Sequence, residues 1–302
     1  MRTSLSQQIQ NALMYTSTAS NKLTEAQTHA VSGKRIIRPS DDVPGTNKAL
    51  SLRSAINTVD QFANNITVST PLLDATQNAL QDMVNAVKLV RSKAETAAKP
   101  DVTGSEKQTT LQELDDILAQ MVDIANTKHT DQYIFSGTAT DTPAVQVAAD
   151  GTYTYDGNSG QRSTQVLSWV SLKVNVPGNT AFNFDGSAGA GTTDLFTMVT
   201  QLKSAVKSGD VKTISAQLTN IDANLDNLLS NTAKVGSWAA RMEASSGTLD
   251  DMDTRLQEML SDTEDIDLAE AVVQLKTQEN VYQAALAVTS RIMNLSLASM
   301  NS

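Results

Sequence analysis

Few side chains in this sequence are of the types that catalyse reactions or bind metals, and their spacing fits neither task. The chain has no cysteine and two histidines, His29 and His129, which lie far apart. The lack of cysteine excludes disulfides, thiol nucleophiles and thiolate metal ligands together. Neither histidine belongs to an HExxH or other metal-ligand motif, so we interpret both as structural or surface residues. We predict no metal and no cofactor.

Pairs of adjacent aspartates are the remaining candidates for acid–base chemistry or calcium binding. They are Asp41 and Asp42, Asp115 and Asp116, and Asp250 and Asp251. Neighbouring residues on a helix do not share a face, and no EF-hand spacing around a central glycine is present. The sequence also lacks a Gly-x-Ser-x-Gly elbow, a Walker loop and a GxGxxG turn. We therefore predict solvated surface for the helical pairs and no enzyme activity.

A small basic cluster, Lys34, Arg35 and Arg38, stands in a chain with a formal net charge of -10. Nucleic acids and anionic lipids need more extensive clusters of Lys and Arg, and no stretch approaches the roughly 20 apolar residues of a membrane span. We expect no nucleic acid and no membrane insertion. The cluster is predicted to pair with carboxylates of a neighbouring segment or subunit, and the partner of the chain is expected to be another protein.

The elements that must position these residues begin and end with long helices that carry narrow heptad seams. Small and apolar residues alternate steps of four and three over about seven turns, as in a coiled coil. The N-terminal seam consists of Leu5, Ile9, Ala12, Thr16, Ala19, Leu23, Ala26 and Ala30. The C-terminal seam consists of Leu268, Val272, Leu275, Glu279, Tyr282, Leu286, Thr289 and Met293. Large apolar groups are sparse in both seams, so we expect neither helix to be stable alone and predict that their apolar members form an assembly interface.

Between these ends the pattern predicts helices on both sides of a small β region. Residues 32–45 form a loop, because two glycines and two prolines forbid a continuous helix. A helix is expected over about 46–70, and Ser69-Thr70-Pro71 resembles the N-terminal cap of the next one. Short alternating segments between Tyr133 and Phe184 predict a small antiparallel sheet.

Helices resume at Thr193, with Ser208-Gly209-Asp210 as a turn and cap. Because the chain goes out and comes back, its termini are expected to lie near each other in an elongated molecule. The predicted organisation is an N-terminal assembly helix and loop (1–45), an ascending helical rod (46–131), a central β-rich outer domain (132–192), a returning helical rod (193–262) and a C-terminal assembly helix (263–302).

Two groups of residues resemble a known family. The loop Ser32-Gly33-Lys34-Arg35-Ile36, with Pro39-Ser40-Asp41-Asp42 and Gly45, follows the N-terminal heptad helix as it does in the bacterial flagellins and their hook-associated relatives. Tyr133-Ile134-Phe135-Ser136-Gly137 and the stretch from Tyr155 to Gly178 look like the central region of the hook-associated members. The resemblance covers essentially the whole chain, and its loop motif includes Gly33, Arg35, Pro39, Asp41 and Asp42.

The resemblance implies a mainly α, flagellin-like helical bundle with paired terminal coiled-coil helices and a central β-rich domain. It implies a secreted, extracellular structural protein of the bacterial flagellum, exported unfolded by the type III apparatus with the help of a chaperone. Its subunits would self-assemble into a tubular ring between the adjoining hook-associated protein and the flagellin filament, forming the junction between hook and filament. Ordering of the terminal helices is then expected to be coupled to assembly.

Three other functions are alternatives to this one. A short filament flagellin shares the terminal helices, but the Tyr133–Gly137 motif and the central β region argue against it. A non-flagellar coiled-coil adaptor or signalling rod predicts a stable helical oligomer with folded termini. An enzyme is the most distant of these hypotheses.

Overall fold

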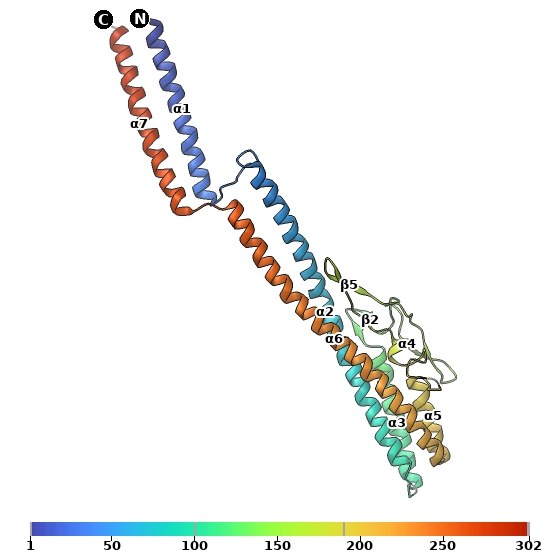
Figure 1. Ribbon diagram of the computed structural model, residues 1–302. Coiled ribbons are helices and arrows are strands. Elements are labelled where there is room, and N and C mark those ends of the chain that lie inside the picture. Colours follow the sequence, from blue (N-terminus) through green and yellow to red (C-terminus); the bar gives the residue numbers. More distant parts are fainter. Residues whose placement is uncertain (1, 100, 190, 301–302) are drawn as a thin grey trace. The chain divides into compact units, whose positions relative to one another are not determined.

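The computed structural model describes residues 2–99, 101–189 and 191–300, and the side chains of residues 7–294 among them. Its helices are α1 (Arg2–Ser32), α2 (Val43–Ala97), α3 (Gly104–Ala125), α4 (Gly178–Ala181), α5 (Leu195–Ser208), α6 (Val211–Glu264) and α7 (Leu268–Met300). Its strands are β1 (Lys128–His129), β2 (Gln132–Tyr133), β3 (Val145–Val147), β4 (Tyr153–Tyr155), β5 (Ser163–Leu167) and β6 (Val170–Lys173). The prediction of a mainly α fold with a small β insertion is confirmed (Figure 1).

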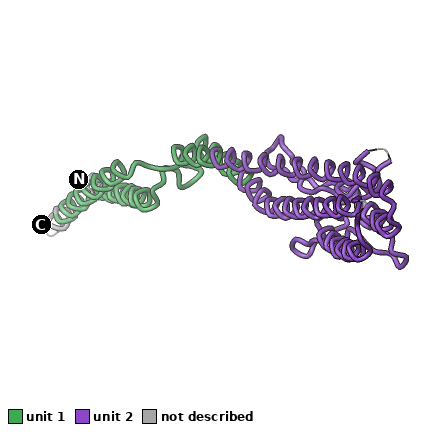
Figure 2. The backbone as a smooth tube through the Cα atoms, turned by 90° about the horizontal axis from the view of Figure 1, so that it is seen from below, with its two compact units in different colours: residues 1–58, 252–302 green, residues 59–251 purple. Residues whose placement is uncertain are grey.

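The chain divides into two compact units (Figure 2). Unit 1 contains residues 1–58 and 252–302, and unit 2 contains residues 59–251. Two long helices, α2 and α6, contribute residues to both units.

Unit 1 is built on the antiparallel pair α1 and α7. Thr16 Oγ1 and Thr289 Oγ1 lie 2.8 Å apart, and near the other end of the pair Ile266 N donates to Gly33 O at 3.0 Å. Segments from opposite ends of the sequence therefore lie side by side, as predicted from the two heptad seams.

Unit 2 packs α2, α3, α5 and α6 around an apolar core. Leu73 and Leu80 of α2, Leu114 of α3 and Leu202 of α5 are each 0% exposed. Local signals set the helix ends: Thr103 and Glu106 form a capping box for α3. The predicted turn at Ser208-Gly209-Asp210 is confirmed, since Gly209 ends α5 with φ 73° and Asp210 Oδ1 accepts from Lys212 N at 3.1 Å.

An aromatic cluster holds the β region onto the helices of unit 2. The rings of Phe135 and Phe182 lie 4.9 Å apart edge to face, and Phe196 of α5 stacks on Tyr153 at 5.5 Å. The strands form separate antiparallel pairs, β1 with β2, β3 with β4 and β5 with β6. The expectation of a single small sheet was therefore wrong in this respect, because each short strand pairs with its neighbour in sequence and then packs against helices.

The helix break predicted at Pro71 does not occur. Pro71 lies inside α2, where its exposed position and the burial of Ile66, Leu72 and Leu73 on either side keep the helix continuous. A proline within a helix costs about 3 kcal/mol, which burial of several large apolar side chains offsets. In the same way α6 runs through Gly236, because its seam from Ile214 through Leu249 stays buried.

Candidate assembly site

The face of α1 that meets α7 carries the predicted N-terminal seam. Ala12 and Ala19 are 6% and 5% exposed, and Ile9 and Leu23 are half-buried. Small side chains at the most buried positions let the two helices approach closely. Leu5 lies in α1 but outside the described side chains.

The predicted C-terminal seam is divided between two faces of α7. Leu275 and Tyr282 are half-buried against α1. The other predicted apolar members are largely exposed: Leu268 at 59%, Val272 at 50%, Leu286 at 44% and Met293 at 48%. About half of the surface of each side chain is therefore left uncovered in the single chain.

The contact with α1 uses smaller residues of α7 that the sequence prediction missed. Ala271 is 2% exposed, and Ala285 and Ile292 are half-buried. Thr289, which is a member of the predicted seam, is 8% exposed. With the predicted Leu275, Tyr282 and Thr289 the three missed residues form the row that faces α1. Ala271, Ala285 and Ile292 each stand one position before a predicted member, namely Val272, Leu286 and Met293. The repeat of small residues in the sequence could have indicated the row that faces α1. We predicted the neighbouring row instead, because Val272, Leu286 and Met293 are larger and more apolar.

An apolar groove of about 380 Å³ runs between α1 and α7. Ala12 and Tyr15 line it from α1, and Ala285, Val288 and Ile292 line it from α7. Tyr15 and Val288 are 64% and 54% exposed. The pair α1 and α7 thus presents two apolar surfaces, the exposed residues of α7 and this groove.

The loop that follows α1 is folded by its own aspartates. Gly33 ends the helix with φ +68°, a left-handed conformation that favours glycine. Asp41 Oδ2 accepts from the backbone N–H groups of Arg38 at 2.7 Å and Ile37 at 3.1 Å. Asp42 Oδ1 accepts from Gly45 N at 2.9 Å in the first turn of α2.

These hydrogen bonds hold both aspartates in the ionised form. The Arg38 N–H group lowers the pKa of Asp41, with Ile37 N–H acting in the same direction. The Gly45 N–H group and the Arg35 side chain lower the pKa of Asp42. The adjacent aspartates of the motif are therefore loop and cap residues, and Pro39 lies exposed in the turn between them and the basic cluster.

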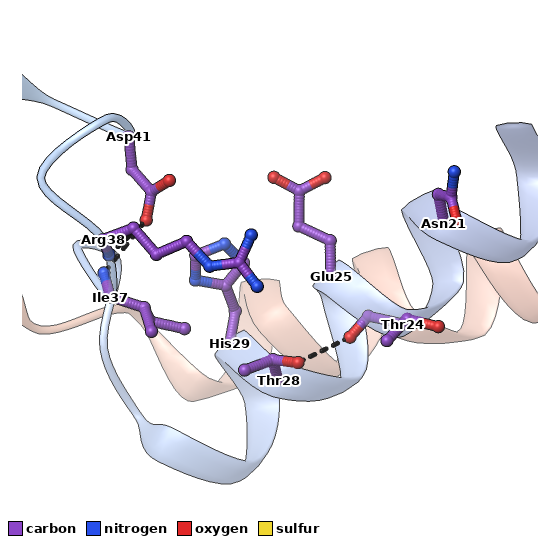
Figure 3. Close-up of a pocket in the computed structure, with 8 residues that line it drawn as sticks. All are labelled: Asn21, Thr24, Glu25, Thr28, His29, Ile37, Arg38 and Asp41. Atoms are coloured by element: carbon purple, nitrogen blue, oxygen red, sulfur yellow. Dashed lines mark hydrogen bonds between the residues drawn. The ribbon is translucent and has the colours of Figure 1, made fainter.

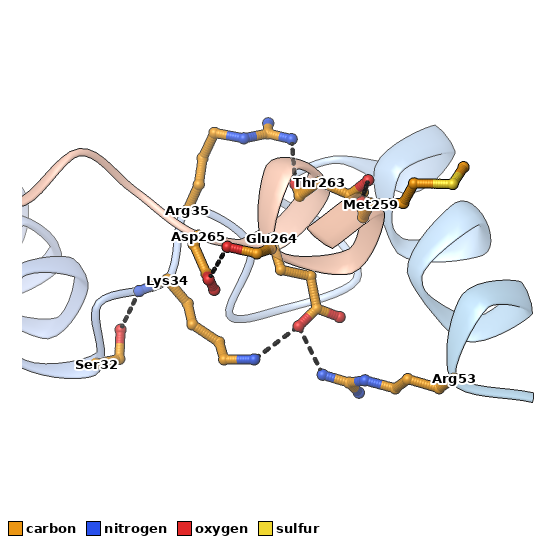
Figure 4. A network of polar contacts seen from close by, with 9 residues as sticks. Ser32, Lys34, Arg35, Arg53, Met259, Thr263, Glu264 and Asp265 are labelled. Carbon is orange, nitrogen blue, oxygen red and sulfur yellow. Dashed lines mark hydrogen bonds and ion pairs between the residues drawn. The ribbon is translucent and has the colours of Figure 1, made fainter. Parts of the chain in front are cut away.

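A buried glutamate, Glu264, joins the loop to the end of α6 (Figure 4). Its side chain is 5% exposed, and its Oε2 atom lies 2.7 Å from both Lys34 Nζ and Arg53 Nη2. Its carbonyl accepts from Arg35 N at 2.6 Å, while the Arg35 side chain donates to Thr263 O at 2.8 Å. The prediction that the basic cluster pairs with carboxylates of a neighbouring segment is confirmed for Lys34, whose partner is Glu264. Arg35 instead pairs with Asp42 of its own loop, at 3.0 Å.

A polar cleft of about 360 Å³ lies between α1 and the loop (Figure 3). Thr24, Thr28 and His29 face it from α1, and Arg38 and Asp41 face it from the loop. His29 Nδ1 is 2.8 Å from Lys34 O, which ties the helix end to the loop. Among the residues that the structure describes, no group of three or more acidic or histidine side chains is placed to hold a metal ion.

These contacts hold the ends of the four helices of unit 1 together. Loop 33–42 and Glu264 fix the chain where α1 gives way to α2 and where α6 gives way to α7. The helix pair that they support is held together by small residues and leaves larger apolar residues exposed. Within the described part of the chain, no helix is long and apolar enough to cross a membrane.

Comparison with known proteins agrees with this architecture. The bacterial flagellin N-terminal helical region matches residues 4–140, and the bacterial flagellin C-terminal helical region matches residues 218–300. Together the two regions account for most of the chain. The chain belongs to the bacterial flagellin family.

Within that family the chain is similar to flagellar hook-associated protein 3. It is 23% identical to that protein of Escherichia coli, over 88% of each chain. It is 24% identical to that protein of Salmonella typhimurium, over 89% of this chain and 90% of the relative.

Solved structures share the fold. A putative flagellar hook-associated protein from Vibrio parahaemolyticus aligns over 74% of this chain and all of its own, with a TM-score of 0.66 and 20% identity. The flagellar junction protein FlgL from Legionella pneumophila aligns over the same shares, with a TM-score of 0.61 and 17% identity.

Proposed function

We propose that this chain is a structural subunit of the junction between the flagellar hook and the filament, and that it assembles through α1 and α7. The observation that carries the proposal is the exposed apolar row of α7, Val272, Leu286 and Met293, which its own α1 leaves uncovered. Membership of the flagellin family and similarity to hook-associated protein 3 support a flagellar role. Neighbouring copies of the terminal helices are the surfaces that would complete this burial.

The energetics favour assembly over a stable isolated helix pair. Fully burying a Leu or Val side chain contributes about 1.5–3 kcal/mol, and these side chains are already half covered. Each therefore gains about 1 kcal/mol when a neighbour covers the rest. Repeated along two helices and several neighbours, this offsets the entropy of ordering the terminal helices.

The proposed partners follow from this role. Copies of the chain form a tubular ring that adjoins a hook-associated protein on one side and flagellin on the other. The chain reaches this position outside the cell through the flagellar type III apparatus, and an export chaperone shields the exposed rows beforehand. Weak terminal seams suit this route, since they leave the ends free to unfold for export and to order on assembly.

A deletion strain tests the proposal. Cells without this chain are expected to keep their hooks and to release flagellin monomers into the medium, because the filament has no junction to grow from. Expression of the intact chain restores attached filaments. Normal attached filaments in the deletion strain would overturn the proposed function.

A further inference from the structure

Trp169 stands at the tip of the β5–β6 hairpin and is 73% exposed. Leu167 pairs with Val170, so Ser168 and Trp169 form the turn. Tryptophan is among the most buried residue types on average, and it is enriched where protein surfaces bind one another. An exposed tryptophan at a protruding turn therefore identifies a candidate contact residue.

The hairpin holds this tip in place. Val166 of β5 and Leu172 of β6 are 0% and 2% exposed, so both strands are anchored by buried side chains. Asn65 Nδ2 of α2 donates to Gln165 O at 2.9 Å, and Ser69 Oγ of α2 donates to Thr164 Oγ1 at 3.2 Å. A side chain presented on a fixed support loses less entropy on binding than one on a free loop.

A groove of matching character lies on the same unit, between α2 and α6, with a volume of about 570 Å³. Ile66, Gly236, Ala239 and Ala240 give it an apolar strip of mostly small residues, and polar side chains line the rest: Thr70, Asp74, Gln77, Glu243 and Ser246. Open space surrounds Gly236, because nothing lies within 4 Å of the position that a Cβ atom would occupy there. A flat aromatic ring fits a surface of this kind.

The edge of the groove complements the polar end of an indole ring. Asp74 of α2 and Glu243 of α6 line it and are exposed. An indole N–H group is a donor only, and carboxylates are acceptors. Trp169 is too exposed to occupy the groove of its own chain.

We infer that Trp169 of one copy seats in the α2–α6 groove of a second copy. The inference rests on the proposed self-assembly and names a contact within it, carried by unit 2 rather than by the terminal helices. Tip and groove are different surfaces, so the contact is heterologous. Contacts of this type propagate from copy to copy and close into rings or continue as helices, which is the geometry that a tubular junction requires.

Cysteine cross-linking in assembled flagella tests the contact, because the natural chain has no cysteine. Two substitutions, Ser168→Cys in the same turn and Ala240→Cys in the groove, are made in one chain that keeps Trp169 and is expressed in the deletion strain. Intact flagella are isolated and treated with a short bismaleimide. The expected result is a ladder of multimers of this chain. The matched control combines Ser168→Cys with Ser237→Cys, an exposed position on α6 outside the groove lining, and is expected to give no ladder.

The outcomes separate this contact from the proposed function. If the doubly substituted chain is present in attached flagella and gives no ladder, or cross-links only to flagellin or another protein, the contact is wrong and the junction role stands. If the chain is absent from the flagellum of cells with normal filaments, the function itself fails.

Substitution of Trp169 itself gives a second test, which does not depend on the introduced cysteines. Trp169→Ala is expected to lower incorporation into flagella by about tenfold or more, as for an interfacial hot spot, while secretion continues. Trp169→Phe keeps the ring and is expected to restore part of the incorporation. Equal incorporation of Trp169→Ala and the natural chain would contradict the contact.

Discussion

Replacing Leu286 with aspartate separates folding of the single chain from assembly. Leu286 lies on the outward row of α7 and is 44% exposed, so aspartate is solvated there in the free chain. The expected cost to the isolated protein is about 0.5–1 kcal/mol, from lower helix propensity and lost partial burial. Unit 2, which does not contain this residue, is expected to keep its thermal unfolding transition.

The same change is expected to be far more costly in the assembled state. Each subunit loses the roughly 1 kcal/mol that burial of the rest of the leucine contributes. A carboxylate buried without a partner costs several kcal/mol more. We therefore expect the secreted variant to leave few or no attached filaments, because the penalty recurs at every copy.

The assay compares circular dichroism of the purified protein with secretion, motility and filament counts in the complemented deletion strain. Gln283→Asp is the matched control, since it adds the same charge on α7 at an exposed polar position. Ile9→Asp, on α1, is expected to behave as Leu286→Asp does in the cell. Normal motility and filament counts with Leu286→Asp would refute the assembly role of this row.

The remaining predictions concern the loop and the core of unit 2. Glu264→Ala is expected to destabilise the loop by about 1–3 kcal/mol. The loss is smaller than for a fully buried ion pair, because the basic partners of Glu264 are half exposed and become hydrated. It is measured as faster hydrogen exchange of the Arg35 amide. The folded chain lowers the pKa values of Asp41 and Asp42. Their contribution to the stability of the loop is therefore complete above their pKa in the unfolded chain, and it is lost as pH falls through their pKa in the folded chain. Loop proteolysis should therefore rise only below about pH 4, and unchanged cleavage at lower pH would contradict it. Burial raises the pKa of Tyr155 to about 12. Unit 2 should therefore lose stability above about pH 10, because the tyrosine ionises in the unfolded chain before it does in the folded one. Tyrosinate absorbance follows the titration, and Tyr155→Phe should remove this part of the pH dependence.

Long seams were predictable from the sequence because heptad spacing is a local property. The N-terminal row from Ile9 to Leu23 faces α7 as its spacing indicated. Pairing of the terminal helices also followed from the sequence, since each seam is too weak to stand alone.

The partner face of α7 was harder to predict, because two overlapping rows of a helix compete for one neighbour. The sequence favours the row with the larger side chains, Val272 and Leu286. The helix instead places the small Ala271 and Ala285 toward α1. Close approach of two helices selects small residues at the contact, and the larger ones remain for another surface.

Long-range polar contacts were beyond local patterns. Glu264 meets Lys34 across 230 positions of sequence, and nothing in its immediate neighbourhood marks it as buried. Pro71 was misleading as a local signal, because it is typical of a helix start but lies inside α2. Burial of apolar side chains along α2 overrides its local preference.

Immunogold labelling of intact flagella with an antibody to this chain tests the central claim most directly. Label is expected only in a short zone where the hook meets the filament, and none is expected in the deletion strain. Label distributed along the whole filament would contradict the claim.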